Sequence, residues 1–199
     1  MADDHTHVQD FFAARAADWD SRFPDDGPAY AAAVQELGLR PGHSVLDAGC
    51  GTGRALPALR GAVGPGGTVI GADLTRDMLN AALRAGRAAS GALLMTDAAR
   101  LPLRTATLDA VFAAGLVSHL PNPGRGLLEL ARVVRPGGRL ALFHPIGRAA
   151  LAARHGRPLS DDDLRAEPRL TPLLAEAGWR LDAYTDEDSR FLALAVRTG

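Results

Sequence analysis

Residues 45–53 read VLDAGCGTG, and this short stretch decides the fold class. An apolar run ends in Asp47, glycines follow at positions 49, 51 and 53, and a helical pattern comes next. A glycine loop between a strand and a helix lets a ligand lie against bare backbone, with helix N–H groups directed toward it. The stretch therefore predicts a ligand-binding loop after the first strand of a parallel sheet.

The glycine spacing argues against a dinucleotide cofactor. With Gly49 and Gly51 as the first pair, the pattern GxGxxG needs a third glycine at position 54, where Arg54 stands. A carboxylate at Asp47 would repel a pyrophosphate and attract a sulfonium or ammonium group. The loop is thus expected to prefer a ligand with a cationic end, the alternative being a tight turn without any ligand.

Short apolar runs alternate with helical patterns beyond residue 42. Strands are expected at 44–46, 68–72, 92–95, 108–112 and 140–143, and helices at 54–63, 76–88 and 125–134. This alternation predicts a parallel sheet covered on both faces. Near the C-terminus, a helix at 171–177 precedes two strand-like runs, 179–185 and 190–197, whose short connection favours antiparallel pairing. The expected fold class is α/β, with a mostly parallel seven-stranded sheet that ends in an antiparallel hairpin.

Two more acids follow the second and third expected strands. Asp73 ends the second run, in GADLTRDML, and Asp97 follows the third, in TDAARLPL. Because the carboxyl ends of parallel strands share one edge of the sheet, both should lie near Asp47. A carboxylate at Asp73 can accept two hydrogen bonds from a ribose diol, a group that dinucleotides also carry.

Composition excludes several classes of enzyme. All 22 basic residues are arginine, which rules out Schiff-base and pyridoxal-phosphate lysines and the GxxxxGK[ST] phosphate loop. The missing lysine also argues against dehydrogenases that rely on a tyrosine–lysine pair. The net charge of −1 and the 5% of aromatic residues give little reason to expect nucleic acid or membrane binding. The single cysteine, an acidic polar N-terminus and no long apolar run suggest a cytoplasmic protein without a secretory signal.

At these motifs the chain resembles the class I S-adenosylmethionine (SAM)-dependent methyltransferases, from about Phe11 to the C-terminus. The resemblance implies a Rossmann-like three-layer sandwich, SAM as the cofactor, S-adenosylhomocysteine as the product and no metal. It implies that Asp47 orients the methionine ammonium and that Asp73 binds the ribose. The complete set of cofactor-binding residues expected from it is Asp47, Gly49, Cys50, Gly51, Gly53, Asp73, Leu74, Asp97, Ala98 and Ala114.

Missing motifs favour a small-molecule acceptor. Residues 108–123, LDAVFAAGLVSHLPNP, resemble the fourth motif of the family but carry AAGL where enzymes that methylate exocyclic base amines have (N/D)PP(Y/F/W). Enzymes that attack cytosine carbon need a cysteine nucleophile at this point, and Cys50 lies in the first loop instead. The expected reaction is methyl transfer to O, N or C of a small molecule.

Candidate acceptor-side residues come from two regions. His119 and His144 follow the fourth and fifth expected strands, so each is a candidate general base; the alternative is a histidine that only hydrogen-bonds a loop. Residues 1–42 resemble a helical cap over the cofactor and acceptor pocket of a Rossmann-like domain at 43–199. Trp19, Arg22 and Tyr30 are the candidate acceptor contacts, although Trp19 fits the core equally well.

Two other functions stay open from the sequence. A SAM-binding or S-adenosylhomocysteine-binding sensor without chemistry of its own would keep the same acids and glycines. An NAD(P)-dependent oxidoreductase of related topology would need a different glycine spacing. The sequence is compatible with a homodimer.

Overall fold

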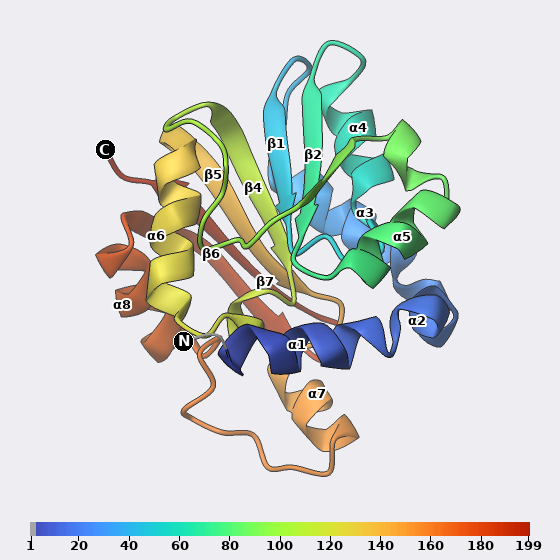
Figure 1. Cartoon of the computed structure of the whole chain (residues 1–199). Helices are drawn as coiled ribbons and strands as arrows, with labels where there is room; N and C mark the ends of the chain where they lie inside the picture. Colours follow the sequence, from blue (N-terminus) through green and yellow to red (C-terminus); the bar gives the residue numbers. More distant parts are fainter. Residues whose placement is uncertain (1–2) are drawn as a thin grey trace.

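The sheet is the centre of the fold and has the strand order β3-β2-β1-β4-β5-β7-β6 (Figure 1). The structure, a computed structural model, describes residues 3–199. Its strands are β1 (Ser44–Ala48), β2 (Thr68–Asp73), β3 (Ala92–Met95), β4 (Leu108–Ala114), β5 (Val134–His144), β6 (Trp179–Glu187) and β7 (Arg190–Arg197). The first five strands pair in parallel, and β7 pairs antiparallel with both β5 and β6. The predicted fold class is confirmed.

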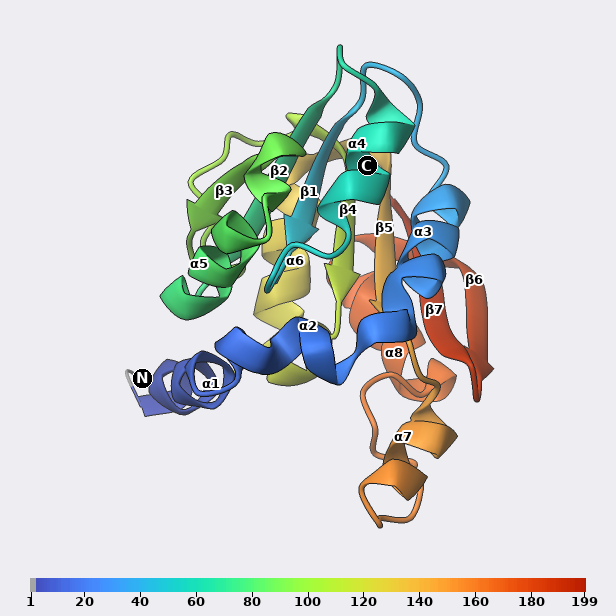
Figure 2. The ribbon, with the colours of Figure 1, turned by 90° about the vertical axis from the view of Figure 1, so that its right-hand side faces the viewer.

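Both faces of the central strands are buried, which explains why they read as apolar runs. In β4, Ala110 and Phe112 join one core cluster, whereas Val111 and Ala113 join the other, since successive side chains point to opposite faces. The first cluster includes residues of α3 (Gly27–Glu36) and α4 (Leu56–Val63). The second includes residues of α6 (Pro123–Val133) and α8 (Glu167–Glu176). These helix pairs form the two outer layers (Figures 1 and 2).

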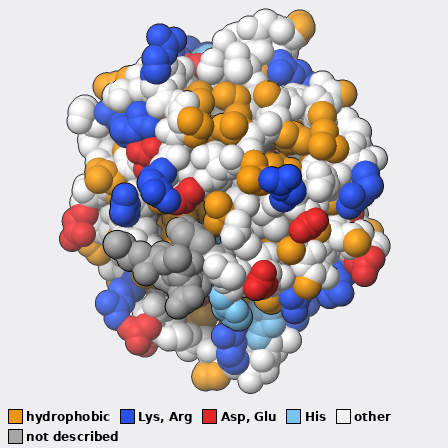
Figure 3. Space-filling model, in the orientation of Figure 1, with side chains coloured by type: hydrophobic (Ala, Val, Ile, Leu, Met, Phe, Trp, Pro, Cys, Tyr) orange, Lys and Arg blue, Asp and Glu red, His pale blue; other side chains and the backbone are white. Residues whose placement is uncertain are grey.

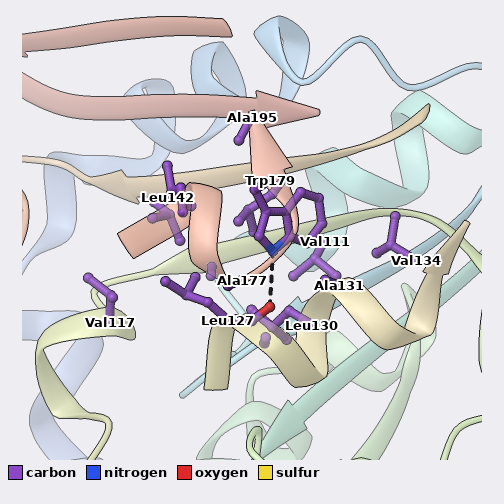
Figure 4. Packing of buried hydrophobic residues seen from close by; sticks show 14 of the residues in the cluster. Val111, Val117, Leu127, Leu130, Ala131, Val134, Leu142, Ala177, Trp179 and Ala195 are labelled. Atoms are coloured by element: carbon purple, nitrogen blue, oxygen red, sulfur yellow. Dashed lines mark hydrogen bonds between the residues drawn. The ribbon is translucent and has the colours of Figure 1, made fainter. Parts of the chain in front are cut away.

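Trp179 connects the antiparallel end of the sheet to a helix layer. It is the first residue of β6 and only 1% exposed. Its indole Nε1 donates a hydrogen bond of 3.0 Å to the carbonyl oxygen of Leu127 in α6, amid apolar side chains (Figure 4). Burying an indole requires a partner for its N–H group. This bond therefore helps fix the position of the terminal hairpin.

The remaining elements lie toward one edge of the sheet or flank it. They are α1 (Asp3–Ala13), α2 (Trp19–Arg22), α5 (Arg76–Arg84) and α7 (Arg148–Arg154). Helix α5 lies beside β2 and β3. Helices α1, α2 and α7 lie beyond the carboxyl ends of the parallel strands, at the bottom of both ribbon views (Figures 1 and 2). No helix in the part described is long and apolar enough to cross a membrane.

Several local expectations differ from the structure; the strand expected at 140–143, for example, begins at Val134. Helix α7 was not anticipated at all, and the helix expected at 171–177 begins at Glu167 instead. Pro172 lies inside that helix, and Pro168 stands in its first turn, where its missing N–H costs no hydrogen bond. The helix expected from 76 to 88 ends at Arg84, where Gly86 adopts a left-handed conformation.

Candidate functional site

A cavity of about 750 Å³ lies at the carboxyl edge of the parallel strands. Its walls come from the ends of β1, β2, β4 and β5, from α1 and α2, and from α7 and the segment before α8. All the site residues expected from the sequence except Gly53 line it: Trp19, Arg22, Tyr30, Asp47, Gly49, Cys50, Gly51, Asp73, Leu74, Asp97, Ala98, Ala114, His119 and His144. The fold thus gathers residues that are up to 125 positions apart, from 19 to 144, around one space.

The glycine loop adopts the backbone conformation that its composition allows. Gly49, Gly51 and Gly53 all have positive φ angles, of 70°, 54° and 78°. The N–H groups of Gly49 and Cys50 both donate to the carbonyl oxygen of Ala72 in β2, at 2.8 and 2.9 Å. Gly53 faces the protein interior, where an added Cβ would lie 2.9 Å from a methyl group of Leu56. Its place is in the turn, away from the cavity wall.

Asp47 carries a buried carboxyl group with unused hydrogen-bonding capacity. The residue is 1% exposed, and its Oδ1 atom has no hydrogen-bond partner in the described structure. Burial, with a smaller contribution from the negative charge of Asp73, raises the pKa of this carboxyl to about 8. A ligand that brought a cationic group to Oδ1 would favour the ionised form. The residue therefore fits the ammonium end of an amino-acid-bearing cofactor.

Asp73 and Asp97 each hold part of the adjoining backbone. Asp73 accepts hydrogen bonds from the N–H groups of Gly51, at 2.8 Å, and Thr75, at 2.7 Å. Burial raises its pKa, while these backbone donors oppose the shift. Asp97 Oδ1 accepts from the N–H of Ala99 at 2.8 Å. Each carboxylate oxygen has a second lone pair, so both acids can still accept bonds from ligand hydroxyl or amino groups.

Cys50 lies in the loop as a small buried side chain. Burial, and then the charges of Asp47 and Asp73, raise the pKa of its thiol well above the ordinary value. A thiol that stays protonated is a poor nucleophile. The chemistry of the cavity therefore does not depend on it.

Aromatic side chains also line the cavity. Phe12 packs against Trp19 and against the imidazole of His119, with ring centroids 5.5 and 5.0 Å apart. Trp19 is half-buried, whereas Arg22 is exposed at the rim. Tyr30 lies deeper, with its ring 5.0 Å from that of Phe143. Burial, with a smaller contribution from Asp47, raises the pKa of the Tyr30 hydroxyl, which stays protonated.

The two candidate histidines differ in their surroundings. Nδ1 of His144 lies 3.1 Å from the backbone N and 2.8 Å from the backbone O of Ile146, which leaves Nε2 for a ligand. Burial lowers the pKa of His144 to about 4, which makes it a weak base. Burial, followed by the charge of Arg165, also lowers the pKa of His119. Both imidazoles are accordingly neutral at pH 7.

Polar contacts bind the N-terminal segment to the glycine loop. Asp20 accepts from the hydroxyl of Thr52 at 2.7 Å and pairs with Arg87 at 2.7 Å. Arg54 donates to Asp26 at 3.2 Å. Helix α3 packs against one face of the sheet, and its Tyr30 reaches the cavity wall. Within the expected cap at 1–42, residues 1–2 lie outside the described part, and α1 and α2 contribute to the cavity wall.

Sequence reasoning missed five arginines of the cavity wall, of which Arg15 and Arg54 come from the N-terminal half and three come from the region after β5. Arg154 lies at the end of α7, Arg157 just beyond it, and Arg165 before α8. The first two belong to the short basic run Arg154–Arg157, RHGR, which was the available signal. Residues 154–157 share the cavity wall with His119 and His144 because the chain folds back toward the ends of β4 and β5.

Comparisons with known proteins agree with this geometry. Residues 46–142 match the family model described as a methyltransferase domain. A SAM-dependent methyltransferase from Aquifex aeolicus is 27% identical, superimposes with a TM-score of 0.72, and aligns over 85% of this chain and 89% of its own. Residues 46–142 thus carry a methyltransferase domain, and the chain has the fold of a SAM-dependent methyltransferase. The prediction of SAM as the cofactor is confirmed by these matches.

Other members of the family are similar over different lengths. Magnesium protoporphyrin IX methyltransferase (ChlM) from Synechocystis, solved with bound S-adenosylhomocysteine, shares the fold at 19% identity and a TM-score of 0.73, over 98% of this chain and 100% of that one. Methyltransferase GfsG from Streptomyces halstedii is 36% identical over 121 residues, which are 59% of this chain and 43% of that protein. The chain thus spans less than half the length of this curated relative.

Proposed function

We propose that this protein transfers the methyl group of SAM to a small-molecule acceptor and releases S-adenosylhomocysteine. The single observation that carries the proposal is the cavity, in which three strand-end acids and the glycine loop adjoin a wall of aromatic side chains. UbiE and GfsG relatives bear names of methyltransferases, and the first of these names refers to ubiquinone and menaquinone biosynthesis. Such names support a small-molecule acceptor.

The cofactor end of the cavity would hold SAM through complementary groups. Asp47 would pair with the methionine ammonium, and Asp73 would accept bonds from the ribose hydroxyls. Leu74 and Ala98 would contact the adenine faces, with Asp97 at its amine. The loop Gly49–Gly51 and Ala114 would border the methionine. When bound, SAM supplies a methyl group on a sulfonium that a nucleophile can displace.

The chain's own contribution to the reaction is positioning and, where needed, removal of a proton. Phe12, Trp19 and Tyr30 would keep water out of the apolar part of the cavity, and Arg22 is exposed at its rim. Holding two reactants in line supplies much of the acceleration of a displacement. His119, neutral at pH 7, is the better base candidate, because the pKa of His144 is about 4.

Calorimetry and isotope transfer test this function together. SAM and S-adenosylhomocysteine should bind with micromolar-range affinity, and isotope-labelled SAM should label a small molecule in a metabolite extract. No SAM binding would overturn the proposal. Binding without transfer to any extract component would favour the sensor function. A rise in melting temperature with NADH, but not with SAM, would favour the oxidoreductase.

Three further parts of the proposal rest on the sequence. We propose that residues 1–42 act as the cap, that nucleic acid is not the acceptor, and that the protein works in the cytoplasm. A homodimer is the proposed assembly, which light scattering after size-exclusion chromatography would test by molar mass against the 20.8 kDa chain.

A further inference from the structure

The charged side chains of the cavity wall differ between the early and the late parts of the chain. The four lining acids, Asp26, Asp47, Asp73 and Asp97, all precede residue 98 in the chain. Among the described residues, every charged or titratable side chain contributed to the wall after that point is an arginine or a histidine: His119, His144, Arg154, His155, Arg157 and Arg165. In Figure 3, histidine side chains gather low on this face, with basic side chains beside them. The wall contributed after residue 98, here called the acceptor end, is therefore basic, whereas the earlier part combines the four acids with Arg15, Arg22 and Arg54.

Local acids compensate only part of this positive charge. Asp163 binds Arg165 through both carboxylate oxygens, at 2.8 and 3.1 Å. Asp163 and Asp186 also pair with the buried Arg148, at 3.4 and 3.2 Å. These two acids thus balance two arginines, Arg148 and Arg165, and fix the segment before α8 against the end of β6.

Arg154 and Arg157 keep their charge uncompensated. Neither guanidinium lies within 4.0 Å of a carboxylate among the described side chains. The nearest polar partner of Arg157 is Nδ1 of His155, at 3.2 Å. Both arginines are exposed at the surface and still reach the cavity wall. Their five-donor guanidinium groups are suited to bind carboxylate or phosphate oxygens in pairs.

An apolar wall lies in the same cavity. Phe12 and Trp19 come from the N-terminal segment, and Leu120, Ile146 and Leu151 come from the loops and helix on the other side. A ligand that fits this end would place an apolar body among these side chains. Its polar end would then be directed toward the basic rim.

We propose that the methyl acceptor is an apolar small molecule bearing a carboxylate or phosphate group, and that Arg154 and Arg157 bind this anionic group. The inference rests on the proposed function and names the chemical class of its acceptor. The anionic group anchors the molecule at the rim, so that its apolar part and the reacting atom lie between His119 and the cofactor end. Arg154 and Arg157 are thus specificity-determining residues.

A matched ligand panel tests the anion site independently of turnover. Apolar carboxylates and aryl phosphates, each paired with its neutral amide or alcohol, are screened by the melting temperature of the protein with and without S-adenosylhomocysteine. The best anions are then titrated by calorimetry. The test variant combines Arg154→Gln with Arg157→Gln, which removes both charges and keeps polar side chains. The control is Arg84→Gln, at an exposed arginine on α5 outside the cavity.

Most of the compounds that raise the melting temperature should be anions. The double variant should lose roughly tenfold in affinity for them, whereas Arg84→Gln should bind as the wild type does. An equal share of neutral compounds, anion binding unchanged in the double variant, or no stabilising anion at all would overturn the proposal. The carboxylate and phosphate arms identify which group is bound. Calorimetry with S-adenosylhomocysteine alone tests the proposed function separately. Absence of cofactor binding would overturn that function and would not change the result of the anion titrations.

Discussion

Replacing Asp47 with asparagine should stabilise the empty protein while weakening cofactor binding. The pKa of Asp47 is about 8 in the folded chain, against an ordinary value of 3.8. Between these two values the folded chain holds a proton that the unfolded chain has released. Stability from this group is thus complete below about pH 4 and is lost as the pH rises toward 8. Asparagine has no charge to bury and removes this dependence.

The size of this stability change follows from the pH range between the two pKa values of Asp47. Each pH unit inside it changes the free energy of unfolding by about 1.4 kcal/mol. From pH 5 to pH 7, the stability difference between Asp47→Asn and the wild type should therefore grow by at most roughly 3 kcal/mol. For a chain of this length, that corresponds to about 5–10 °C in melting temperature. Asparagine keeps a buried polar group at the same place, so other costs largely cancel in the comparison.

Urea unfolding and calorimetric melting at pH 5, 6, 7 and 8 measure this difference, each without ligand. Asp77→Asn, at an exposed position in the first turn of α5, is the control and should stay within about 0.5 kcal/mol of the wild type. With S-adenosylhomocysteine present, Asp47→Asn should lose its advantage because it binds the cofactor weakly. A difference that stays constant from pH 5 to pH 8 would refute the reasoning, as would lower stability of Asp47→Asn at pH 7.

Three further substitutions probe separate contacts. Asp73→Ala removes a bidentate acceptor and the support of the Gly51 N–H group, so calorimetry should show roughly 10–100-fold weaker SAM binding; an unchanged affinity would rule out the ribose contact. His119→Ala should lower turnover in the isotope assay and leave SAM affinity nearly intact, whereas unchanged turnover would exclude it as the base. Trp179→Phe removes the indole N–H that donates to the Leu127 carbonyl and shrinks a buried ring, so it should cost about 1–3 kcal/mol in urea unfolding; a loss under 0.5 kcal/mol would show that these contacts contribute little.

The sequence by itself determined the sheet and the cofactor end of the cavity. Both depend on local patterns in the sequence. Apolar runs indicate buried strands, and the glycine loop lies directly after the first of them. Because parallel strands end at a common edge, Asp47, Asp73 and Asp97 were expected together before any contact was known. The structure places all three on one cavity.

Only the tertiary structure decided the acceptor end and the strand order at the end of the sheet. Strand β7 inserts between β5 and β6, which neighbouring runs in the chain do not specify. Helix α7 is short, and its position depends on the contact between Arg148 and Asp186, 38 positions away. Likewise, Thr52 meets Asp20 across 32 positions. Such contacts join segments distant in the chain, so no local periodicity encodes them.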